Sequence, residues 1–243
     1  MSQTVKRALV TGGSGGIGAA ICRRLAADGH HVYVHSRKSI DAAEKLVREI
    51  TVAGGSAAAL HFDVTDAEGT RTTLESALSS GPIQILVNNA GVHDDAVLPG
   101  MRPDQWQRVI DVAVSGFFNV TQAILMPMIR TRWGRIINMS SVSALIGNKG
   151  QVNYAAAKGA LNSATKALAL EVATRGITVN AVAPGIIRTP MSEGLFDADA
   201  ISRLVPMNRA GLPEEVAHVV AFLASEQAAY LTSQIISVSG GMA

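Results

Sequence analysis

Tyr154 and Lys158 are four residues apart in the stretch QVNYAAAKGAL, which has the composition of a helix. Residues at this spacing lie on one face of a helix, so the phenol and the ammonium are expected to be neighbours. An adjacent positive charge favours the phenolate and lowers the tyrosine pKa from about 10 towards neutral pH. The pair predicts a general acid for a developing alkoxide. The alternative is an ordinary helix-surface pair, since Tyr-x-x-x-Lys is common by chance.

Ser141 supplies a hydroxyl thirteen residues before Tyr154, directly after a predicted strand over residues 135–140. The carboxyl end of a strand is the edge of the sheet where α/β proteins bind ligands. A hydroxyl at this edge is suited to orienting a carbonyl oxygen. Ser140 and Ser143 are close enough in sequence to be mistaken for it. The three residue types together predict a centre that reduces a ketone.

A glycine-rich turn, TGGSGGIG at residues 11–18, joins a short β-branched run to an amphipathic helical pattern. Gly12 allows a sharp turn after the strand, and Gly16 removes a side chain where a pyrophosphate approaches the helix N-terminus. Gly18 lets helix and strand pack closely. The G-x-x-x-G-x-G spacing is one residue longer than the usual fingerprint, and a bare turn also uses glycine. The strand-to-helix setting favours a nucleotide site.

The residues at the end of the second predicted strand bear on the choice of cofactor. An acidic residue there would bond the ribose 2′-hydroxyl and repel a 2′-phosphate. This chain has His35, Ser36, Arg37 and Lys38, and its next carboxylate is Asp41. Two cations and a hydroxyl suit a phosphate, so the sequence favours NADPH over NADH. A solvated basic turn is the alternative.

Short β-branched runs alternate with longer helical patterns along the whole chain. Strands separated by helices imply right-handed crossovers and a parallel sheet covered on both faces. We therefore predict one doubly wound, Rossmann-type α/β domain over residues 1–243, with about seven mainly parallel strands. The predicted strands are residues 7–11, 31–36, 57–62, 83–88, 135–140, 178–182 and 235–238, and the predicted helices are residues 17–28, 41–52, 67–79, 103–129, 152–175 and 213–225.

Composition narrows the class of protein. The chain is 48% hydrophobic and 16% charged, with a net charge of +2 and 4% aromatic residues, which disfavours disorder and nucleic-acid binding. Cys22 is the only cysteine, so an internal disulfide is impossible. The uncharged run 112–129 contains Ser115, Asn119 and Pro127, which favours a buried helix over a membrane span. Without a signal-peptide pattern, a cytoplasmic protein is expected.

Several motifs in order along the chain resemble the short-chain dehydrogenase/reductase family: TGGSGGIG, NNAG, Ser141, Tyr154-x-x-x-Lys158 and PGIIRT. Within that family, GQVNYAAAKGAL, RGITVNAVAPG and the ending SGGMA are most similar to the 3-oxoacyl-[acyl-carrier-protein] reductases. The resemblance implies NADPH-dependent reduction of a 3-oxoacyl thioester to the 3-hydroxyacyl product, in fatty-acid or related polyketide-type synthesis. It also implies a short substrate lid near residues 192–206.

The resemblance further implies roles for single residues. Ser141 would polarise the ketone, Tyr154 would give the proton, and Lys158 would hold the nicotinamide ribose and lower the tyrosine pKa. The hydride would pass directly to the carbonyl carbon, so no metal is required. The implied cofactor contacts are Gly12, Ser14, Gly16, Ile17 and Gly18 at the pyrophosphate, Arg37 at the 2′-phosphate, Asp63 and Val64 at the adenine, Asn89, Ala90 and Gly91 at the ribose, and Ile187 and Thr189 at the nicotinamide.

Two positions depart from the family pattern. Members that prefer NADPH usually have an arginine where this chain has Gly15, so Arg37 carries most of the phosphate preference. Ala113 stands where the family places a catalytic asparagine, which supports a water-mediated proton relay to the lysine. Alanine keeps the backbone carbonyl and loses the amide. We expect this carbonyl to hold the relay water, giving an active enzyme with a triad in place of a tetrad.

The resemblance also suggests partners. Arginines matching Arg132 and Arg175 meet the acidic carrier protein near the site entrance, and steering of that kind raises encounter rates. Scattered surface charge is the alternative. A homotetramer is expected, with the long helices at 103–129 and 152–175 packed against their copies. Two other functions stay open: a reductase or dehydrogenase for another ketone or alcohol, and a weakly active partner subunit, which Ala113 alone supports.

Overall fold

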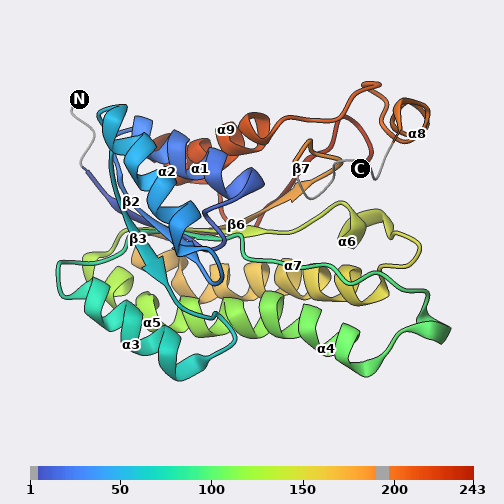
Figure 1. The fold of residues 1–243 in the computed structure, drawn as a ribbon. Coiled ribbons are helices and arrows are strands. Elements are labelled where there is room, and N and C mark those ends of the chain that lie inside the picture. The colour runs from blue at the N-terminus through green and yellow to red at the C-terminus, as the bar shows by residue number, and fades with distance from the viewer. Residues whose placement is uncertain (1–4, 190–196) are drawn as a thin grey trace.

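The computed structural model describes residues 5–189 and 197–243, which form a parallel sheet between two layers of helices (Figure 1). The sheet order is β3-β2-β1-β4-β5-β6-β7, and its strand pairs are parallel. Its strands are β1 (Arg7–Val10), β2 (His31–Ser36), β3 (Ser56–His61), β4 (Ile85–Asn88), β5 (Gly134–Met139), β6 (Ile177–Pro184) and β7 (Ile235–Val238). The predicted doubly wound α/β fold and its seven strands are confirmed. The order reverses between β1 and β4, where such folds bind nucleotides.

Helices cover both faces of the sheet, and Figure 1 shows α1, α2 and α9 on one side and α3, α4, α5 and α7 on the other. The first group comprises α1 (Gly16–Ala27), α2 (Ile40–Val52) and α9 (Pro213–Ala224). The second comprises α3 (Ala67–Leu78), α4 (Pro103–Ile110), α5 (Gly116–Thr131) and α7 (Val152–Val172). The helix predicted over residues 152–175 ends in a short 3-10 turn, η3 (Ala173–Arg175). The sequence did not predict the short elements α6 (Ser143–Ile146), α8 (Ala198–Leu204), η1 (Leu98–Gly100) and η4 (Glu226–Ala228).

Each face of the sheet has its own apolar core. Leu9 and Val10 are adjacent on β1 and completely buried, but they belong to different clusters because successive strand residues point to opposite faces. Cys22 is buried in the cluster beside α1, as expected. Burial on both sides explains why the central strands have continuous apolar runs instead of alternating ones.

The helix predicted over residues 103–129 is continuous from Pro103 to Thr131 but contains a π-helical turn, η2 (Asp111–Ser115). By length and composition this helix passes the test for a membrane span. Val120, Ile124 and Met128 are nevertheless completely buried in the core beneath the sheet, which is the packing expected of a core helix. A π-helical turn inside an α-helix often marks a functional site.

A chain of buried amides and hydroxyls fastens the two long helices to the sheet. Asn88 Nδ2 on β4 donates to Thr121 Oγ1 on α5 at 3.1 Å and to Asn138 Oδ1 on β5 at 2.9 Å. Asn138 Nδ2 then donates to Thr165 Oγ1 on α7 at 2.8 Å. Since an unpaired buried polar group is costly, each of these bonds also specifies the register of helix against sheet.

The glycine turn after β1 is held close to the segment after β4. Gly12 and Gly16 have positive φ values of 61° and 48°, which glycine adopts without strain. Asn89 Nδ2 donates to the carbonyls of Thr11 and Gly12 at 2.9 and 3.0 Å. Gly18 lies against this junction, and its missing side chain permits the close approach of helix and turn.

We predict that Gly18→Ala destabilises the protein by about 2 kcal/mol, because overpacking a closed site costs this order of free energy. The added Cβ would clash with the Gly12 carbonyl oxygen and lie 2.7 Å from Asn89 Nδ2. Gly15→Ala is the matched control, since its Cβ would meet nothing within 4 Å. Urea unfolding of both variants measures the difference, and equal stability would show that Gly18 is not needed for packing.

Candidate functional site

The structure brings together the three side chains predicted to be catalytic. Ser141 follows β5, while Tyr154 and Lys158 lie in the first two turns of α7. The Ser141 side chain hydrogen-bonds to Tyr154, and Lys158 Nζ lies 5.6 Å from the centroid of the tyrosine ring. All three are at the carboxyl edge of the sheet, as the sequence predicts.

Lys158 is buried against the end of β5. Its Nζ donates to the Met139 carbonyl at 2.6 Å, and burial lowers its pKa from 10.5 to about 8. A Cβ added to Gly91 would lie 3.4 Å from Nζ, so glycine leaves open space beside the ammonium. The buried lysine is thus held against the end of β5, with Gly91 of the segment after β4 close to its ammonium.

Tyr154 differs from the sequence-based expectation in the direction of its pKa shift. Burial raises the pKa of the phenol, the hydrogen bond from Ser141 lowers it, and the negative charge of Asp95 raises it further. The net pKa is raised. The expectation that Lys158 lowers it was wrong for this structure, because desolvation dominates and the lysine bonds to the Met139 carbonyl. A raised pKa keeps the phenol protonated at neutral pH.

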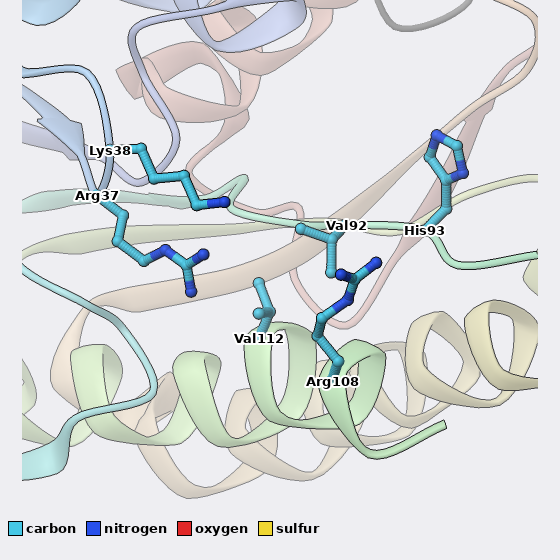
Figure 2. Close-up of a pocket in the computed structure, with 6 residues that line it drawn as sticks. All are labelled: Arg37, Lys38, Val92, His93, Arg108 and Val112. Carbon is cyan, nitrogen blue, oxygen red and sulfur yellow. The ribbon is translucent and has the colours of Figure 1, made fainter. Parts of the chain in front are cut away.

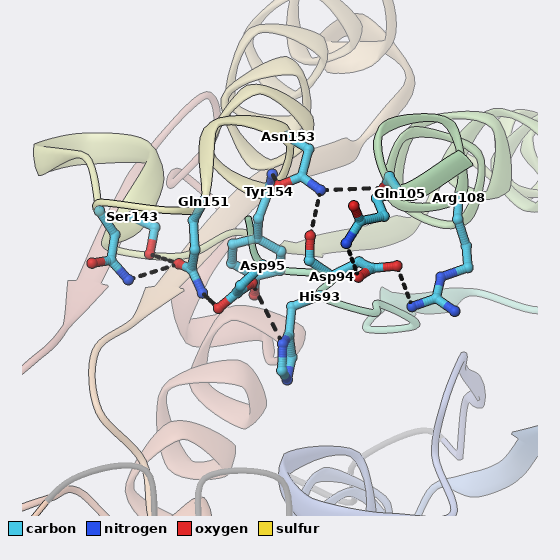
Figure 3. Close-up of polar contacts among 10 residues, drawn as sticks. His93, Asp94, Asp95, Gln105, Arg108, Ser143, Gln151, Asn153 and Tyr154 are labelled. Carbon is cyan, nitrogen blue, oxygen red and sulfur yellow. Dashed lines mark hydrogen bonds and ion pairs between the residues drawn. The ribbon is translucent and has the colours of Figure 1, made fainter. Parts of the chain in front are cut away.

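A series of hydrogen bonds that the sequence did not predict connects Asp95 with Ser143 (Figure 3), the neighbour of Ser141. Asp95 Oδ2 accepts from Gln151 Nε2 at 2.9 Å, and Gln151 Oε1 accepts from Ser143 Oγ at 3.0 Å. The Ser143 backbone N–H donates to Ser141 Oγ at 3.2 Å. Ser143 is therefore a neighbour that supports Ser141. The only sequence signal was the polar run HDD soon after NNAG.

Asp94 joins helix α4 to the beginning of α7 (Figure 3). Its Oδ1 accepts from Gln105 Nε2 at 2.7 Å, and its backbone carbonyl accepts from Asn153 Nδ2 at 2.9 Å. Its Oδ2 forms an ion pair with Arg108 at 2.8 Å. These contacts fix the helix that carries Tyr154 relative to the helix that carries Ala113.

Ala113 lies within the π-helical turn and is buried in a small apolar cluster with Val109, Ala157 and Tyr154. The Gly116 backbone N–H donates to the Ala113 carbonyl. A carbonyl oxygen has two lone pairs, so it can accept more than one hydrogen bond. The expectation that this carbonyl holds a relay water stays a prediction.

A basic hollow lies at the same edge, and of the residues predicted to hold a dinucleotide Arg37 is among those that line it. Figure 2 shows side chains from the end of β2, the segment after β4 and α4 around a cavity of about 250 Å³. Arg37 Nη1 forms an ion pair with Asp63 Oδ2 at 3.2 Å, so two of the predicted cofactor residues are neighbours. The cavity is lined by Arg37, Lys38, Val92, His93, Arg108 and Val112. A phosphate-bearing dinucleotide fits this charge and the open glycine turn.

Other predicted cofactor residues surround the glycine turn. A Cβ added to Gly16 would lie 3.3 Å from Thr189 Cγ2, which places the end of the PGIIRT segment over the turn. Ile187 is buried and forms a β-bridge with Gly211, and Val64 is also buried. Ser14, Ile17, Ala90 and Gly91 are half-buried at the same edge. Of the predicted lid at 192–206, residues 192–196 lie outside the described residues.

The two arginines predicted to meet a carrier protein are neighbours, but they are distant from Tyr154 in the same chain. Arg132 Nη2 donates to the Thr174 carbonyl at 3.0 Å, next to Arg175. Tyr154 and Arg175 lie at opposite ends of α7 and η3, roughly 30 Å apart at 1.5 Å of rise per residue. Within one subunit, Arg132 and Arg175 are therefore too far from Tyr154 to lie at the entrance of the same site.

Comparison with known proteins identifies the family. A family model described as short chain dehydrogenase matches residues 6–200. The chain belongs to the short-chain dehydrogenase family. It is 45% identical over 244 residues to the 3-oxoacyl-[acyl-carrier-protein] reductase FabG of Aggregatibacter actinomycetemcomitans, covering 100% of both chains. It is 45% identical over 241 residues to the 3-oxoacyl-[acyl-carrier-protein] reductase of Synechocystis sp., covering 98% of this chain and 97% of that one.

A third relative, the FabG protein of Staphylococcus aureus, is 43% identical over 240 residues and 98% of each chain. As a short-chain dehydrogenase, this chain is an oxidoreductase that uses a nicotinamide cofactor. The resemblance inferred from the sequence motifs is confirmed.

We predict that Lys158→Met removes a pH dependence of stability in this short-chain dehydrogenase. The lysine pKa is about 8 in the folded protein and near 10.5 when unfolded, so between these values the unfolded state binds more protons. Wild-type stability should therefore rise by about 3 kcal/mol relative to the variant as pH increases through this window. Urea unfolding at pH 7 and pH 10.5 measures it. A constant difference would contradict the lowered pKa.

Proposed function

We propose that this enzyme is a cytoplasmic NADPH-dependent reductase of 3-oxoacyl thioesters carried by an acyl-carrier protein, acting in fatty-acid or related polyketide-type synthesis. The observation that carries the proposal is the half-buried Tyr154, which is hydrogen-bonded to Ser141 and lies beside Lys158 at the edge of the sheet. The names of the three relatives, which match over nearly their full lengths, support the substrate class.

The proposed chemistry assigns one task to each side chain. A bound reduced nicotinamide supplies the hydride. Tyr154 donates its proton to the carbonyl oxygen as that oxygen gains negative charge, and its raised pKa ensures that the proton is present beforehand. Ser141, already hydrogen-bonded to the tyrosine, orients the same oxygen. The positive charge of the Lys158 ammonium stabilises the negative charge that remains on the phenolate.

The preference for NADPH is proposed from the charge around the cavity. Arg37 and Lys38 both line it, and the chain places no carboxylate between them and Asp41. Asp63 offsets part of the Arg37 charge, whereas Lys38 has no ion pair among residues 5–189 and 197–243. The net positive lining suits a 2′-phosphate better than a bare hydroxyl.

Carrier binding is proposed at the surface formed by Arg132 and Arg175. Since these arginines are far from Tyr154 in their own chain, the proposal requires a homo-oligomer in which a second copy lies beside them. The outer faces of α5 and α7 expose large apolar side chains, with Phe118, Met126 and Leu170 being 56%, 54% and 80% exposed. Such a face supports the expected tetramer packed through the long helices.

We predict that the purified protein oxidises NADPH with a 3-oxoacyl thioester and prefers NADPH to NADH. Tyr154→Phe should reduce kcat by a factor of about 10³, the usual contribution of a positioned general acid. The assay follows absorbance of the reduced nicotinamide in parallel reactions with the two cofactors. Turnover only of unrelated ketones would favour another substrate class. Turnover only after a homologous partner is added would favour the supporting-subunit role raised by Ala113.

Reversing the charge at both carrier-facing positions, Arg132→Glu with Arg175→Glu, should raise KM about tenfold for the carrier-bound substrate. It should change KM for a small thioester less than about twofold, because the chemistry at Tyr154 is unaffected. Arg23→Glu with Arg48→Glu, on α1 and α2, is the charge-matched control. Equal changes for both substrates would remove the carrier site from these arginines.

A further inference from the structure

Arg108 is the α4 residue whose charged side chain lines the basic cavity. It lies four residues before Val112, so the two side chains share one face of the helix, and both line the cavity with Arg37. Figure 2 shows Arg37 and Arg108 extending towards this space from different sides, with Val112 between them. The cavity therefore carries positive charge on its α4 side as well as at the end of β2.

The glycine turn contributes no cation to this cavity. The turn TGGSGGIG contains neither Arg nor Lys, and a Cβ at its exposed Gly15 would meet nothing within 4 Å. The space is open, so packing does not explain the missing side chain. A cation that interacts with a phosphate must then come from another element.

The position of Arg108 is fixed before any ligand binds. Its Nη2 pairs with Asp94 Oδ2 at 2.8 Å, and Asp94 is itself held by Gln105 Nε2 at 2.7 Å. A guanidinium has five N–H donors in a rigid plane, so pairing at one nitrogen leaves donors for a second anion. Anchoring the side chain in advance lowers the entropy lost on binding.

A purely structural role for Arg108, linking α4 to the segment at residues 93–95, does not account for its position at the cavity. The link between α4 and the segment at residues 93–95 is already made by Gln105, and Asn153 bonds the Asp94 backbone from α7. Both bonds are independent of the Arg108 charge. Arg108 is also 58% exposed at its side chain, which leaves it accessible to a ligand in the cavity.

We propose that Arg108 is a second specificity-determining residue for the cofactor 2′-phosphate, acting from α4 while Arg37 acts from the end of β2. This inference rests on the proposed use of NADPH. It places a second positive charge on a helix on the other side of the cavity from Arg37. The anchor Asp94 is then a positioning residue for cofactor choice.

The test measures cofactor binding by calorimetry, without substrate, using NADP⁺ and NAD⁺ as paired probes. Arg108→Gln should weaken NADP⁺ binding about tenfold, which is the usual scale for losing one hydrogen bond to a charged group. NAD⁺ binding should change less than about twofold, because it lacks the 2′-phosphate. Arg108→Lys should recover most of the affinity, and raised salt should reduce the difference between variants.

Arg102→Gln is the matched control, since Arg102 precedes α4, pairs with the exposed Asp104 and does not line the cavity. It should leave the affinities for both nucleotides unchanged. Equal weakening of NADP⁺ and NAD⁺ by Arg108→Gln, or no weakening of either, would overturn the inference.

Arg37→Gln separates this inference from the proposed cofactor. If Arg37→Gln abolishes the preference for NADP⁺ while Arg108→Gln does not alter it, the Arg108 assignment fails and the NADPH proposal stands. If the wild-type protein binds NAD⁺ as tightly as NADP⁺, the NADPH proposal itself fails.

Discussion

The burial of the Lys158 ammonium beside Tyr154 is the constraint on which the rest of this site depends. Lys158 is buried with its ammonium on the Met139 carbonyl, and Tyr154 is half-buried beside it. Burying a charge costs free energy unless it is compensated, so the lysine pKa falls to about 8. With a pKa of about 8 the lysine is still mostly charged at neutral pH, and a bound ligand that adds acceptors near Gly91 would stabilise that charge further.

The fold supplies the rigidity that this arrangement needs. Both catalytic groups are on α7, and the buried bond between Asn138 and Thr165 holds that helix to β5. Asn88 extends the same chain to α5, so the helix with the π-helical turn is fixed to the same strands. Because these hydrogen-bonded amides and hydroxyls are buried, shifting either helix would leave an unsatisfied amide. Packing thus keeps Ser141 and Tyr154 within hydrogen-bonding reach.

The sequence was sufficient for the fold and for choosing three side chains, predicted to be catalytic, that the structure brings together. Seven β-branched runs and a glycine turn specify a doubly wound sheet, and the spacing of Tyr154 and Lys158 specifies a shared helix face. The direction of the tyrosine pKa was not predictable, because burial depends on elements far apart in sequence. The π-helical turn was missed because an extra residue in a helix leaves no clear propensity signal. The contacts of Asp94 and Asp95 were not predictable either, because their partners at positions 105, 108 and 151 are distant in the sequence.

Asp94 and Asp95 are adjacent, but one contacts a residue of the cofactor cavity and the other acts on the tyrosine. Asp94 pairs with Arg108, whose side chain lines the cofactor cavity, while Asp95 is bonded to Gln151 and raises the pKa of Tyr154. A negative charge near the tyrosine opposes the phenolate and favours the protonated phenol. Reduction of a ketone needs that proton, whereas oxidation of an alcohol needs the phenolate. The electrostatics of this segment therefore keep Tyr154 in the protonated form from which the proposed reduction starts.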